Sequence, residues 1–199
     1  MNSNLDKLEE YLKEKILPDL EKSRGGFDMI HTLEVVDWLK QIIKQNPDLN
    51  LDETVLLIAA YAHDWGYSEI FTERQVMNFE LVENAKSLHM ELGAKKVEKL
   101  LKDDFFSFLS DKQKIRCIHL VAAHDKKFEI KDTDELALME ADMLSGLDIN
   151  NNKPIYDAES NKKFMEAIIT TRIPKFITKF SKDEVQKLIQ KREEYYKGK

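Results

Sequence analysis

The chain has 199 residues, of which 42% are hydrophobic and 34% are charged, and its formal net charge is −6. This balance is typical of a globular protein and excludes a disordered chain, while the length suits one domain with a well-formed core. The negative charge argues against a broad electrostatic contact with nucleic acid, so no nucleic-acid partner is expected.

The sequence is poor in turn-forming residues and has a single cysteine. It contains 6 glycines and 4 prolines, and its one thiol is Cys117. So few glycines and prolines favour helices over many short strands, and a lone cysteine excludes an intrachain disulfide and fits a reducing compartment. We find no apolar signal-peptide core and no membrane-spanning run of about 20 apolar residues. We therefore expect an all-α protein in the cytoplasm, without a membrane partner.

The first two helices are predicted from apolar residues at helical spacing. One covers residues 4–22 and ends at Ser23–Gly26, whose two glycines favour open backbone conformations. The next begins near Phe27 and carries His31 on its apolar stripe. It should end near Asn46, because the residue before a proline avoids the helical region.

The third helix is the most apolar segment of the chain. Residues 55–62 read VLLIAAYA, apolar on all sides, which predicts a helix at the centre of the fold. Asp52 is suited to cap its start. The helix delivers His63 and Asp64 at its carboxyl end, where Gly66 would permit a turn.

Five further helices are expected in the rest of the chain. A long one over 79–101 carries His89, and the next, with Asp111 as its cap, carries His119 and His124. The remaining segments are an irregular connection over 67–79, a helix over 133–147, a loop over 150–154, and two last helices ending in a solvated, frayed KREEYYKGK.

The adjacent pair His63–Asp64 predicts a metal site. Burying a carboxylate without a partner is costly, so Asp64 beside such an apolar helix needs a cation or strong hydrogen bonds. Neutral imidazole and carboxylate together suit divalent zinc, iron and manganese.

With His31 and Asp142, this pair resembles the H…HD…D signature of the HD superfamily of metal-dependent phosphohydrolases. The resemblance covers about residues 27–147 and implies an all-helical fold in which the HD pair ends a central helix. We therefore expect a single HD-type domain over 1–199, a bundle of about eight helices. Its motif-bearing core would span about 27–147, with C-terminal helices at about 155–196 packed on it.

The last residue of the signature is one of two acids in MEADML. Glu140 and Asp142 are both candidates, but only Asp142 falls in register with Leu138 and Met139 on the inward side. Asp142 is therefore the predicted ligand.

Two more histidines resemble the extra ligands of six-ligand members of the superfamily. His89 stands in HMELGA, similar to an H…GA segment, and His124 ends IHLVAAH, similar to an I..H segment before the last aspartate. Those members include dinucleoside tetraphosphate hydrolases and HD-GYP phosphodiesterases, and they bind two metals. The resemblance implies one or two divalent ions (iron, manganese, magnesium, zinc or nickel), with Asp64 bridging, on His31, His63, Asp64, His89, His124 and Asp142.

The chain also departs from these relatives. The HD-GYP proteins have a lysine where this chain has Tyr67, and they carry a paired histidine and a GYP loop that are absent here. This argues against a cyclic dinucleotide phosphodiesterase of that type. His119 remains an alternative to His124 as ligand, because five positions separate the two and they cannot share one helical face.

The expected reaction is hydrolysis of a phosphoester or phosphoanhydride by a metal-bound hydroxide, with Asp64 as the catalytic residue. The substrate would be a small nucleotide or another phosphorylated metabolite. Two alternatives stay open: a di-iron oxygenase of the HD type, and a nucleotide-binding signalling domain without turnover. Oligomeric state has no signature in the sequence. Arginine matches a phosphate with its fork of donors, and the candidate substrate contacts are Arg24, Tyr67, His119, Lys126 and Lys127.

Overall fold

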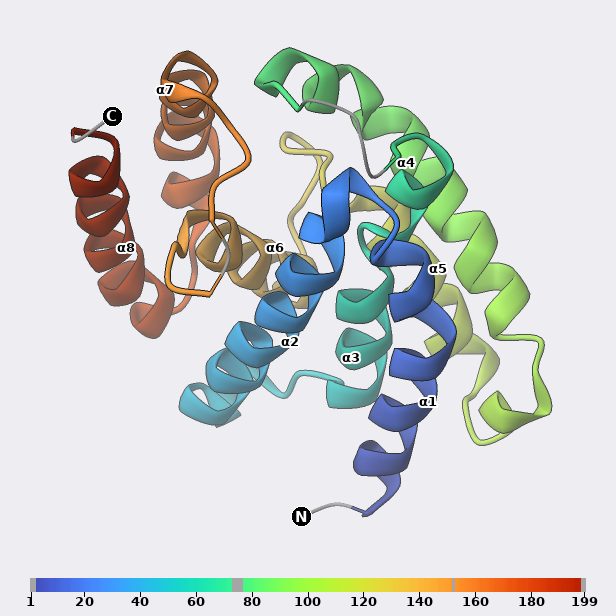
Figure 1. Ribbon diagram of the computed structural model, residues 1–199. Helices are drawn as coiled ribbons and strands as arrows, with labels where there is room; N and C mark the ends of the chain where they lie inside the picture. The colour runs from blue at the N-terminus through green and yellow to red at the C-terminus, as the bar shows by residue number, and fades with distance from the viewer. Residues whose placement is uncertain (1–2, 73–76, 152, 198–199) are drawn as a thin grey trace.

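The computed structural model describes residues 3–72, 77–151 and 153–197. Within these ranges the regular structure is helical throughout, as the sequence predicts, with eight α-helices joined by short 3-10 and π segments (Figure 1). The helices are α1 (Ser3–Leu20), α2 (Phe27–Gln45), α3 (Glu53–Ala62), α4 (Phe79–Leu100), α5 (Asp111–Ala123), α6 (Thr133–Leu147), α7 (Ala158–Ala167) and α8 (Lys179–Lys197).

Helix α3 lies at the centre of the fold. Residues 55–62 are each at most 4% exposed, and α3 contacts α1, α2, α5 and α6, which enclose it in Figure 1. Burial of a surface that is apolar on all sides places this helix in the interior. The carboxylate of Asp52 accepts a hydrogen bond from the amide of Val55 at 3.1 Å, so the predicted cap is confirmed.

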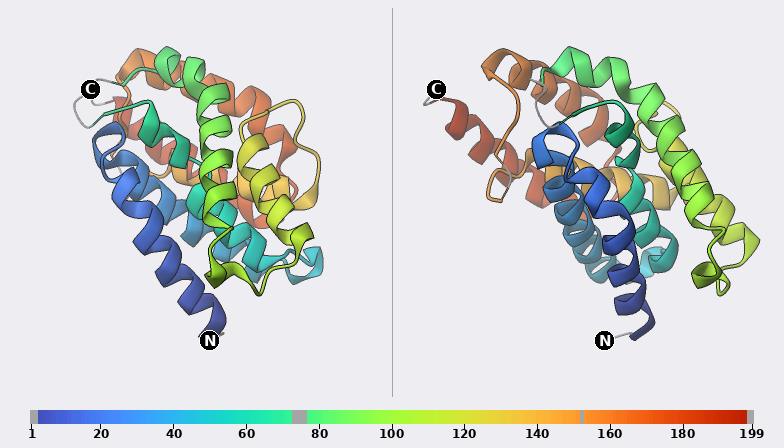
Figure 2. Two further views of the ribbon diagram at one scale, coloured as in Figure 1. Left: turned by 90° about the vertical axis from the view of Figure 1, so that its right-hand side faces the viewer. Right: turned by 45° about the vertical axis from the view of Figure 1, so that its right-hand side comes forward.

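The other helices pack in pairs around α3. Helix α2 packs along α6, and α4 packs along α5, which Figure 2 shows beside each other at the outer surface. Helix α8 packs on α6, and α4 also contacts α7. None of the described helices is long and apolar enough to cross a membrane.

The chain between α1 and α2 turns through left-handed backbone conformations. Gly25 and Gly26 have φ angles of 67° and 82°, which glycine adopts at no steric cost. Arg24 also has a positive φ, 45°, a conformation that is uncommon for a residue with a side chain. The predicted break at this point is therefore confirmed, and Arg24 lies in the short 3-10 segment just before α2.

Two local predictions need correction near α4 and α5. Ser110, not Asp111, caps α5, because the Ser110 hydroxyl accepts a hydrogen bond from the amide of Gln113 at 3.3 Å. The segment 67–79 was expected to be irregular, but its first residues belong to a 3-10 helix, Trp65–Glu69, which packs against α4. Residues 73–76 of that connection, and residue 152 of the later loop, lie outside the described residues.

The C-terminal segment agrees with its prediction in extent but not in burial. Helix α8 ends at Lys197, close to the predicted residue 196, and residues 198–199 lie outside the described part of the chain. Arg192, expected on a solvated face, is 3% exposed. Arg192 is buried because α8 packs on α6, so that this side of α8 faces the interior.

Candidate metal centre

Six side chains from five helices converge beside the carboxyl end of α3. His31 comes from α2, His89 from α4 and Asp142 from α6, while His63 ends α3 and His124 ends α5. Asp64 follows His63 directly. All six are buried. These are the six residues that the resemblance to six-ligand proteins implies, and the fold brings them together.

Asp64 stands between two pairs of histidines. Its Oδ2 lies 3.7 Å from the Nε2 of His31 and 3.7 Å from that of His63. Its Oδ1 lies 3.5 Å from the Nε2 of His89 and 3.7 Å from that of His124. Two groups of possible metal ligands therefore share Asp64, each with all its donor atoms within 4.8 Å of one another.

Asp142 belongs with the first of these groups. Its Oδ1 lies 3.1 Å from the Nε2 of His31 and 3.9 Å from that of His63. Glu140, the other acid of MEADML, is buried but points elsewhere: it accepts hydrogen bonds from the Thr178 amide at 3.0 Å and the Thr178 hydroxyl at 2.5 Å. Glu140 thus holds the start of α8.

The outer nitrogens of the histidines determine how the inner ones are protonated. The Nδ1 of His63 donates to the Ala60 carbonyl at 2.8 Å, and the Nδ1 of His124 donates to the Val121 carbonyl at 2.9 Å. These carbonyls lie three residues back along helices α3 and α5, where each helix leaves its last acceptors without partners. In the neutral ring a proton on Nδ1 leaves the lone pair on Nε2, which faces the cluster.

The other two histidines are held in the same way. The Nδ1 of His89 lies 3.4 Å from the Ala85 carbonyl, and that of His31 lies 2.9 Å from the Ser145 hydroxyl. That hydroxyl can donate onward to Glu34 at 3.2 Å and so accept from His31. Such outer hydrogen bonds are what orient the imidazole ligands of metal sites.

This donor set fits divalent metal ions. The Nε2 atoms of His31 and His63 are 3.3 Å apart, and those of His89 and His124 are 3.1 Å apart. Two nitrogens this close cannot both turn lone pairs toward each other. Either one ring of each pair carries a proton there, which the raised pKa values of His31 and His124 favour, or a metal ion accepts both lone pairs. Imidazole and carboxylate ligands together suit zinc, iron and manganese.

The pKa values of the buried rings follow from burial and from their partners. Burial lowers the pKa of His63, and burial together with the charge of His124 lowers that of His89 to about 4. Burial opposes the charged form of His31 as well, but its hydrogen bond with Asp142 outweighs this and raises its pKa. The same bond lowers the pKa of Asp142 despite its burial.

Asp64 carries a firmly ionised carboxylate. Burial opposes its charge, but His63, His124 and Arg24 outweigh this effect and hold the pKa of Asp64 well below its usual range. The Nη2 of Arg24 donates to the Oδ2 of Asp64 at 2.8 Å, and its Nε donates to the Oδ1 of Asp28 at 2.6 Å. A buried cation thus fixes the orientation of Asp64.

Aromatic rings hold this arginine in place. The guanidinium of Arg24 lies 4.1 Å from the ring of Tyr67 and 5.2 Å from that of Phe27. Tyr67 in turn stacks on His89, with ring centroids 3.9 Å apart and an interplanar angle of 10°. The aromatic residue that stands in place of the HD-GYP lysine therefore links Arg24 to a candidate metal ligand.

Gly66 has a different role from the predicted turn. Its φ is not positive, and a Cβ placed on it would lie 1.9 Å from the carbonyl oxygen of His89. Glycine is needed here because α4 passes directly against the 3-10 helix that follows Asp64. This close approach is what brings His89 to Asp64.

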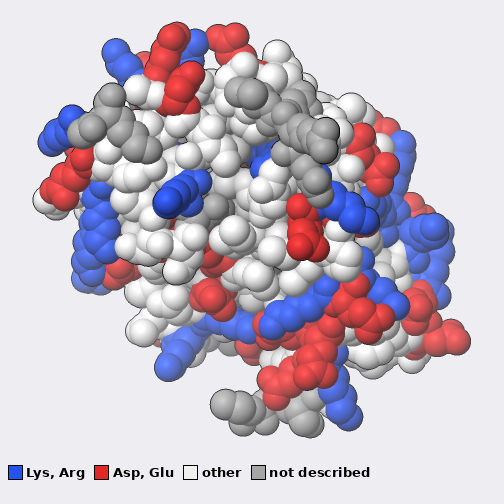
Figure 3. Space-filling view, in the orientation of Figure 1, with Lys and Arg blue, Asp and Glu red and all other residues white. Residues whose placement is uncertain are grey.

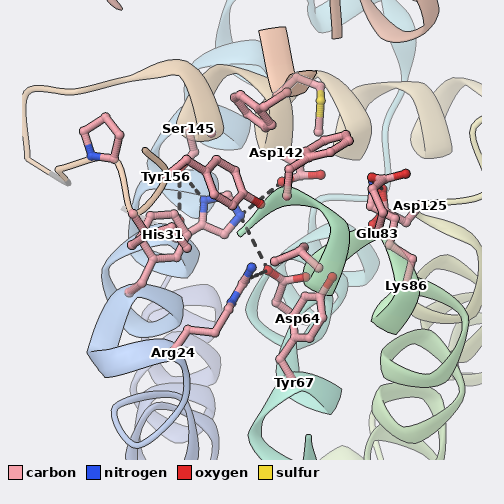
Figure 4. A pocket seen from close by; sticks show the side chains of 18 of the residues that line it. Arg24, His31, Asp64, Tyr67, Glu83, Lys86, Asp125, Asp142, Ser145 and Tyr156 are labelled. Atoms are coloured by element: carbon pink, nitrogen blue, oxygen red, sulfur yellow. Dashed lines mark hydrogen bonds and ion pairs between the residues drawn. The ribbon is translucent and has the colours of Figure 1, made fainter. Parts of the chain in front are cut away.

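A cavity of about 750 Å³, part of it open to solvent, adjoins the cluster. In Figure 4 the side chains of Arg24, His31, Asp64, Tyr67 and Tyr156 face into it, and the ion pairs and hydrogen bonds around Asp64 lie at its base. The cationic residues of its lining are Arg24, Lys86 and Arg192, and its large apolar residues are Phe27, Tyr67, Phe79, Met143, Ile155, Tyr156 and Phe164.

Three of the predicted substrate contacts do not line this cavity. The side chain of His119 is half exposed and bonds to Glu135 at 2.7 Å. Lys126 pairs with Glu129 at 3.7 Å, and the ammonium of Lys127 lies over a neighbouring phenylalanine ring. Lys127 instead lines a neighbouring pocket that shares Phe79 and Lys86 with this cavity. Arg24 and Tyr67, by contrast, do line the cavity.

The cavity contains two cationic side chains that sequence reasoning missed. Lys86 lies one helical turn before His89 on α4, so its spacing could have placed it on the same face. Burial opposes its charge, but Asp125 and Glu83 outweigh this and raise the pKa of Lys86. Arg192 had no comparable signal, because it lies far along the chain from every motif.

The surface shows no extended basic stripe on the face in view. In Figure 3 uncharged atoms fill most of the middle of this face, and basic and acidic residues are mixed around its margin.

The all-helical fold and the buried His/Asp cluster at the end of its central apolar helix are typical of metal-binding helical domains. The family model described as HD domain matches residues 29–155, well over half of the chain, and the chain belongs to this family. The family falls within the superfamily of metal-dependent phosphohydrolases. Searches of curated proteins and of solved structures gave no match.

Proposed function

We propose that this protein hydrolyses a phosphoester or phosphoanhydride bond of a small soluble metabolite at a centre of one or two divalent metal ions. One observation carries the proposal: two ligand groups share Asp64, and Asp64 lines a cavity that is open to solvent. Bound there, the ions would polarise a phosphoryl oxygen and lower the pKa of a water molecule.

The protein's own residues orient this chemistry. Asp64 acts as a shared ligand, because each of its oxygens faces a different histidine pair. Its low pKa makes it a better ligand than proton acceptor. Arg24 restrains Asp64 through one N–H and is itself anchored by Asp28. Its role is therefore to position the bridging carboxylate.

The cavity supplies contacts for the substrate. The ammonium of Lys86, which lies 3.3 Å from Asp125, offers positive charge to phosphoryl oxygens. Phe79, Tyr156 and Phe164 form an aromatic cluster on the cavity wall, with ring centroids of successive members 6.3 and 5.6 Å apart. Such a surface suits the non-phosphate part of a substrate, including a nucleobase.

Metal analysis and a substrate screen test the proposal. Purified protein is expected to contain at least about one equivalent of iron, manganese or zinc per chain, since buried His/Asp sites bind such ions tightly. It should hydrolyse members of a panel of sugar phosphates, nucleotides and dinucleoside polyphosphates, followed as released phosphate or, for the dinucleotides, as product nucleotides by chromatography. A chelator should abolish this hydrolysis. Metal content below about half an equivalent under every condition, with no hydrolysis, would contradict the proposal.

The same preparation separates the two alternative functions. A di-iron oxygenase would consume oxygen in the presence of a substrate, so oxygen uptake is measured beside phosphate release. A signalling domain would bind nucleotides in the metal-loaded state without turnover of any panel member. Phosphate release without oxygen uptake supports the hydrolase alone.

A further inference from the structure

Arg192 is a buried cation in the cavity wall, and the described residues offer it no anionic partner. It is 3% exposed and lines the same cavity as the metal centre. In the described part of the chain no carboxylate oxygen lies within 4.0 Å of its guanidinium. The other buried or half-buried cations nearby differ: Arg24 lies 2.8 Å from Asp64, and Lys86 lies 3.3 Å from Asp125.

Neutral groups hold Arg192 in a fixed orientation. Its Nε donates to the Oδ1 of Asn161 at 2.7 Å, and its Nη1 donates to the Gly146 carbonyl at 2.7 Å. Its guanidinium lies 4.8 Å from the ring of Phe164 and 5.9 Å from that of Tyr196. Among the described residues Nη2 has no hydrogen-bond partner. The guanidinium of Arg192 is therefore held in one orientation by neutral groups, and no described carboxylate balances its charge.

An uncompensated buried charge has a cost that the rest of the fold does not explain. Taking a guanidinium out of water is unfavourable unless an anion or a full set of hydrogen bonds replaces the solvent. Burial accordingly lowers the pKa of Arg192. The two aromatic rings offset only part of this cost. A ligand anion in the cavity would supply the missing partner.

We propose that Arg192 binds a second anionic group of the substrate, distinct from the phosphoryl group that reacts at the metal centre. The inference rests on the proposed function and narrows its substrate class to metabolites with two anionic groups, such as bisphosphates or phosphorylated carboxylic acids. Arginine is suited to either group, because its fork matches both phosphate and carboxylate. The family match ends at residue 155, so Arg192 confers this specificity from helix α8, beyond the matched part.

Matched pairs of ligands test this inference on the metal-loaded protein by calorimetry. Fructose 1,6-bisphosphate is compared with fructose 6-phosphate, adenosine 3′,5′-bisphosphate with adenosine 5′-monophosphate, and 3-phosphoglycerate with glycerol 3-phosphate. In each pair only one compound has the second anion, and the last pair tests a carboxylate. The wild-type protein is expected to bind the doubly anionic member of at least one pair about tenfold or more tightly, the usual effect of a charge-assisted hydrogen bond.

Two variants assign this preference to Arg192. In Arg192→Gln the preference should fall to within about twofold, while affinity for the singly anionic compound is retained. In Lys191→Gln, which removes the same charge from an exposed neighbour on α8, the preference should remain. Arg192→Lys keeps the charge but loses the fork, so it should show an intermediate preference.

Several results would overturn the inference. Equal affinity of the wild-type protein for both members of every pair would do so, even if Arg192→Gln failed to fold. An unchanged preference in folded Arg192→Gln would do so as well. The binding ratio needs no turnover, so an inactive protein that still prefers double anions would contradict the proposed hydrolysis but not the role of Arg192. A protein that hydrolyses phosphorylated compounds but does not prefer double anions would contradict only the role proposed for Arg192.

Discussion

The Nε2 atoms of His89 and His124 lie 3.1 Å apart, although the two residues belong to α4 and to the end of α5. Both rings lie near Oδ1 of Asp64, whereas His31 and His63 lie near its Oδ2. The second ligand group thus depends on how α4 and α5 pack. The packing of α4 against α5 therefore decides whether a second group of possible ligands exists beside the first.

Removing His124 should remove the second metal ion. We expect His124→Ala to bind about one equivalent fewer metal ions than the wild-type protein and to lose at least about 100-fold in kcat, since a metal ion contributes several kcal/mol to transition-state stabilisation. Metal analysis by mass spectrometry and phosphate release measure both effects. His119→Ala is the matched control, because His119 is half exposed and bonds to Glu135 instead. Equal metal content in both variants would refute the assignment of His124.

Adding one methyl group at Gly66 should disturb the fold and the second ligand group together. The Cβ of alanine would lie 1.9 Å from the His89 carbonyl oxygen, so α4 would have to move away from Asp64. We expect Gly66→Ala to reduce the free energy of unfolding by about 2–3 kcal/mol, as overpacking does elsewhere. Urea denaturation and metal analysis test this.

The control for that substitution is Gly146→Ala. A Cβ at this position of α6 would lie 3.4 Å from the Phe164 ring, an ordinary contact. Alanine also favours a helix over glycine by about 0.5–1 kcal/mol, so stability should stay level or rise. Similar losses of stability in both variants would show that the approach of α4 at Gly66 is not critical.

Neutralising Arg24 should be far more costly than neutralising a surface arginine. Arg24→Gln leaves the carboxylates of Asp28 and Asp64 buried without their cation, and breaking such a pair costs about 3–5 kcal/mol. Arg116→Gln removes ion pairs with Asp132 and Asp134 that are partly exposed, and it should cost about 1 kcal/mol or less. Chemical denaturation in the presence of a chelator compares the two without a contribution from metal. Equal costs would argue against a structural role of Arg24.

Glu9 should make stability depend on pH below 5. Partial burial opposes its charge, but hydrogen bonds from Lys40, Lys13 and Tyr61 outweigh this and lower its pKa to about 2, from 4.5. Since the folded-state pKa lies below the unfolded one, this stabilisation is complete above the unfolded value and disappears as the pH falls toward 2. After allowance for solvent screening it should amount to about 1 kcal/mol.

Denaturation curves at pH 7 and pH 3 test this role of Glu9. At pH 7, Glu9→Gln should be less stable than the wild-type protein, and the difference should shrink at pH 3. Glu10→Gln, at an exposed position one residue later, should show no such pH-dependent difference. A constant difference between Glu9→Gln and wild type at both pH values would mean that the ion pairs contribute nothing.

Much of the fold follows from local sequence. The uniform apolarity of residues 55–62 places α3 in the interior, because no face of that helix can remain in water. The two glycines before Phe27 set the break between α1 and α2 through their backbone freedom. His63 and Asp64 then stand at the end of the central helix by connectivity alone, which is why their part in the site could be predicted.

The partners of these residues depend on tertiary packing. Spacing along one helix places His89 on a face, but only the approach of α4 at Gly66 brings that face to Asp64. Lys86 lines the cavity and Lys126 does not. Spacing along one helix could not predict this difference, because the cavity is formed by side chains from several helices packed together. Arg192 is the clearest case: the charged run around it suggests solvent, and it is buried because α8 packs on α6. The sequence by itself determines the helices and the HD pair, whereas the tertiary structure decides which charged side chains line the cavity, because that depends on contacts between residues far apart in the chain.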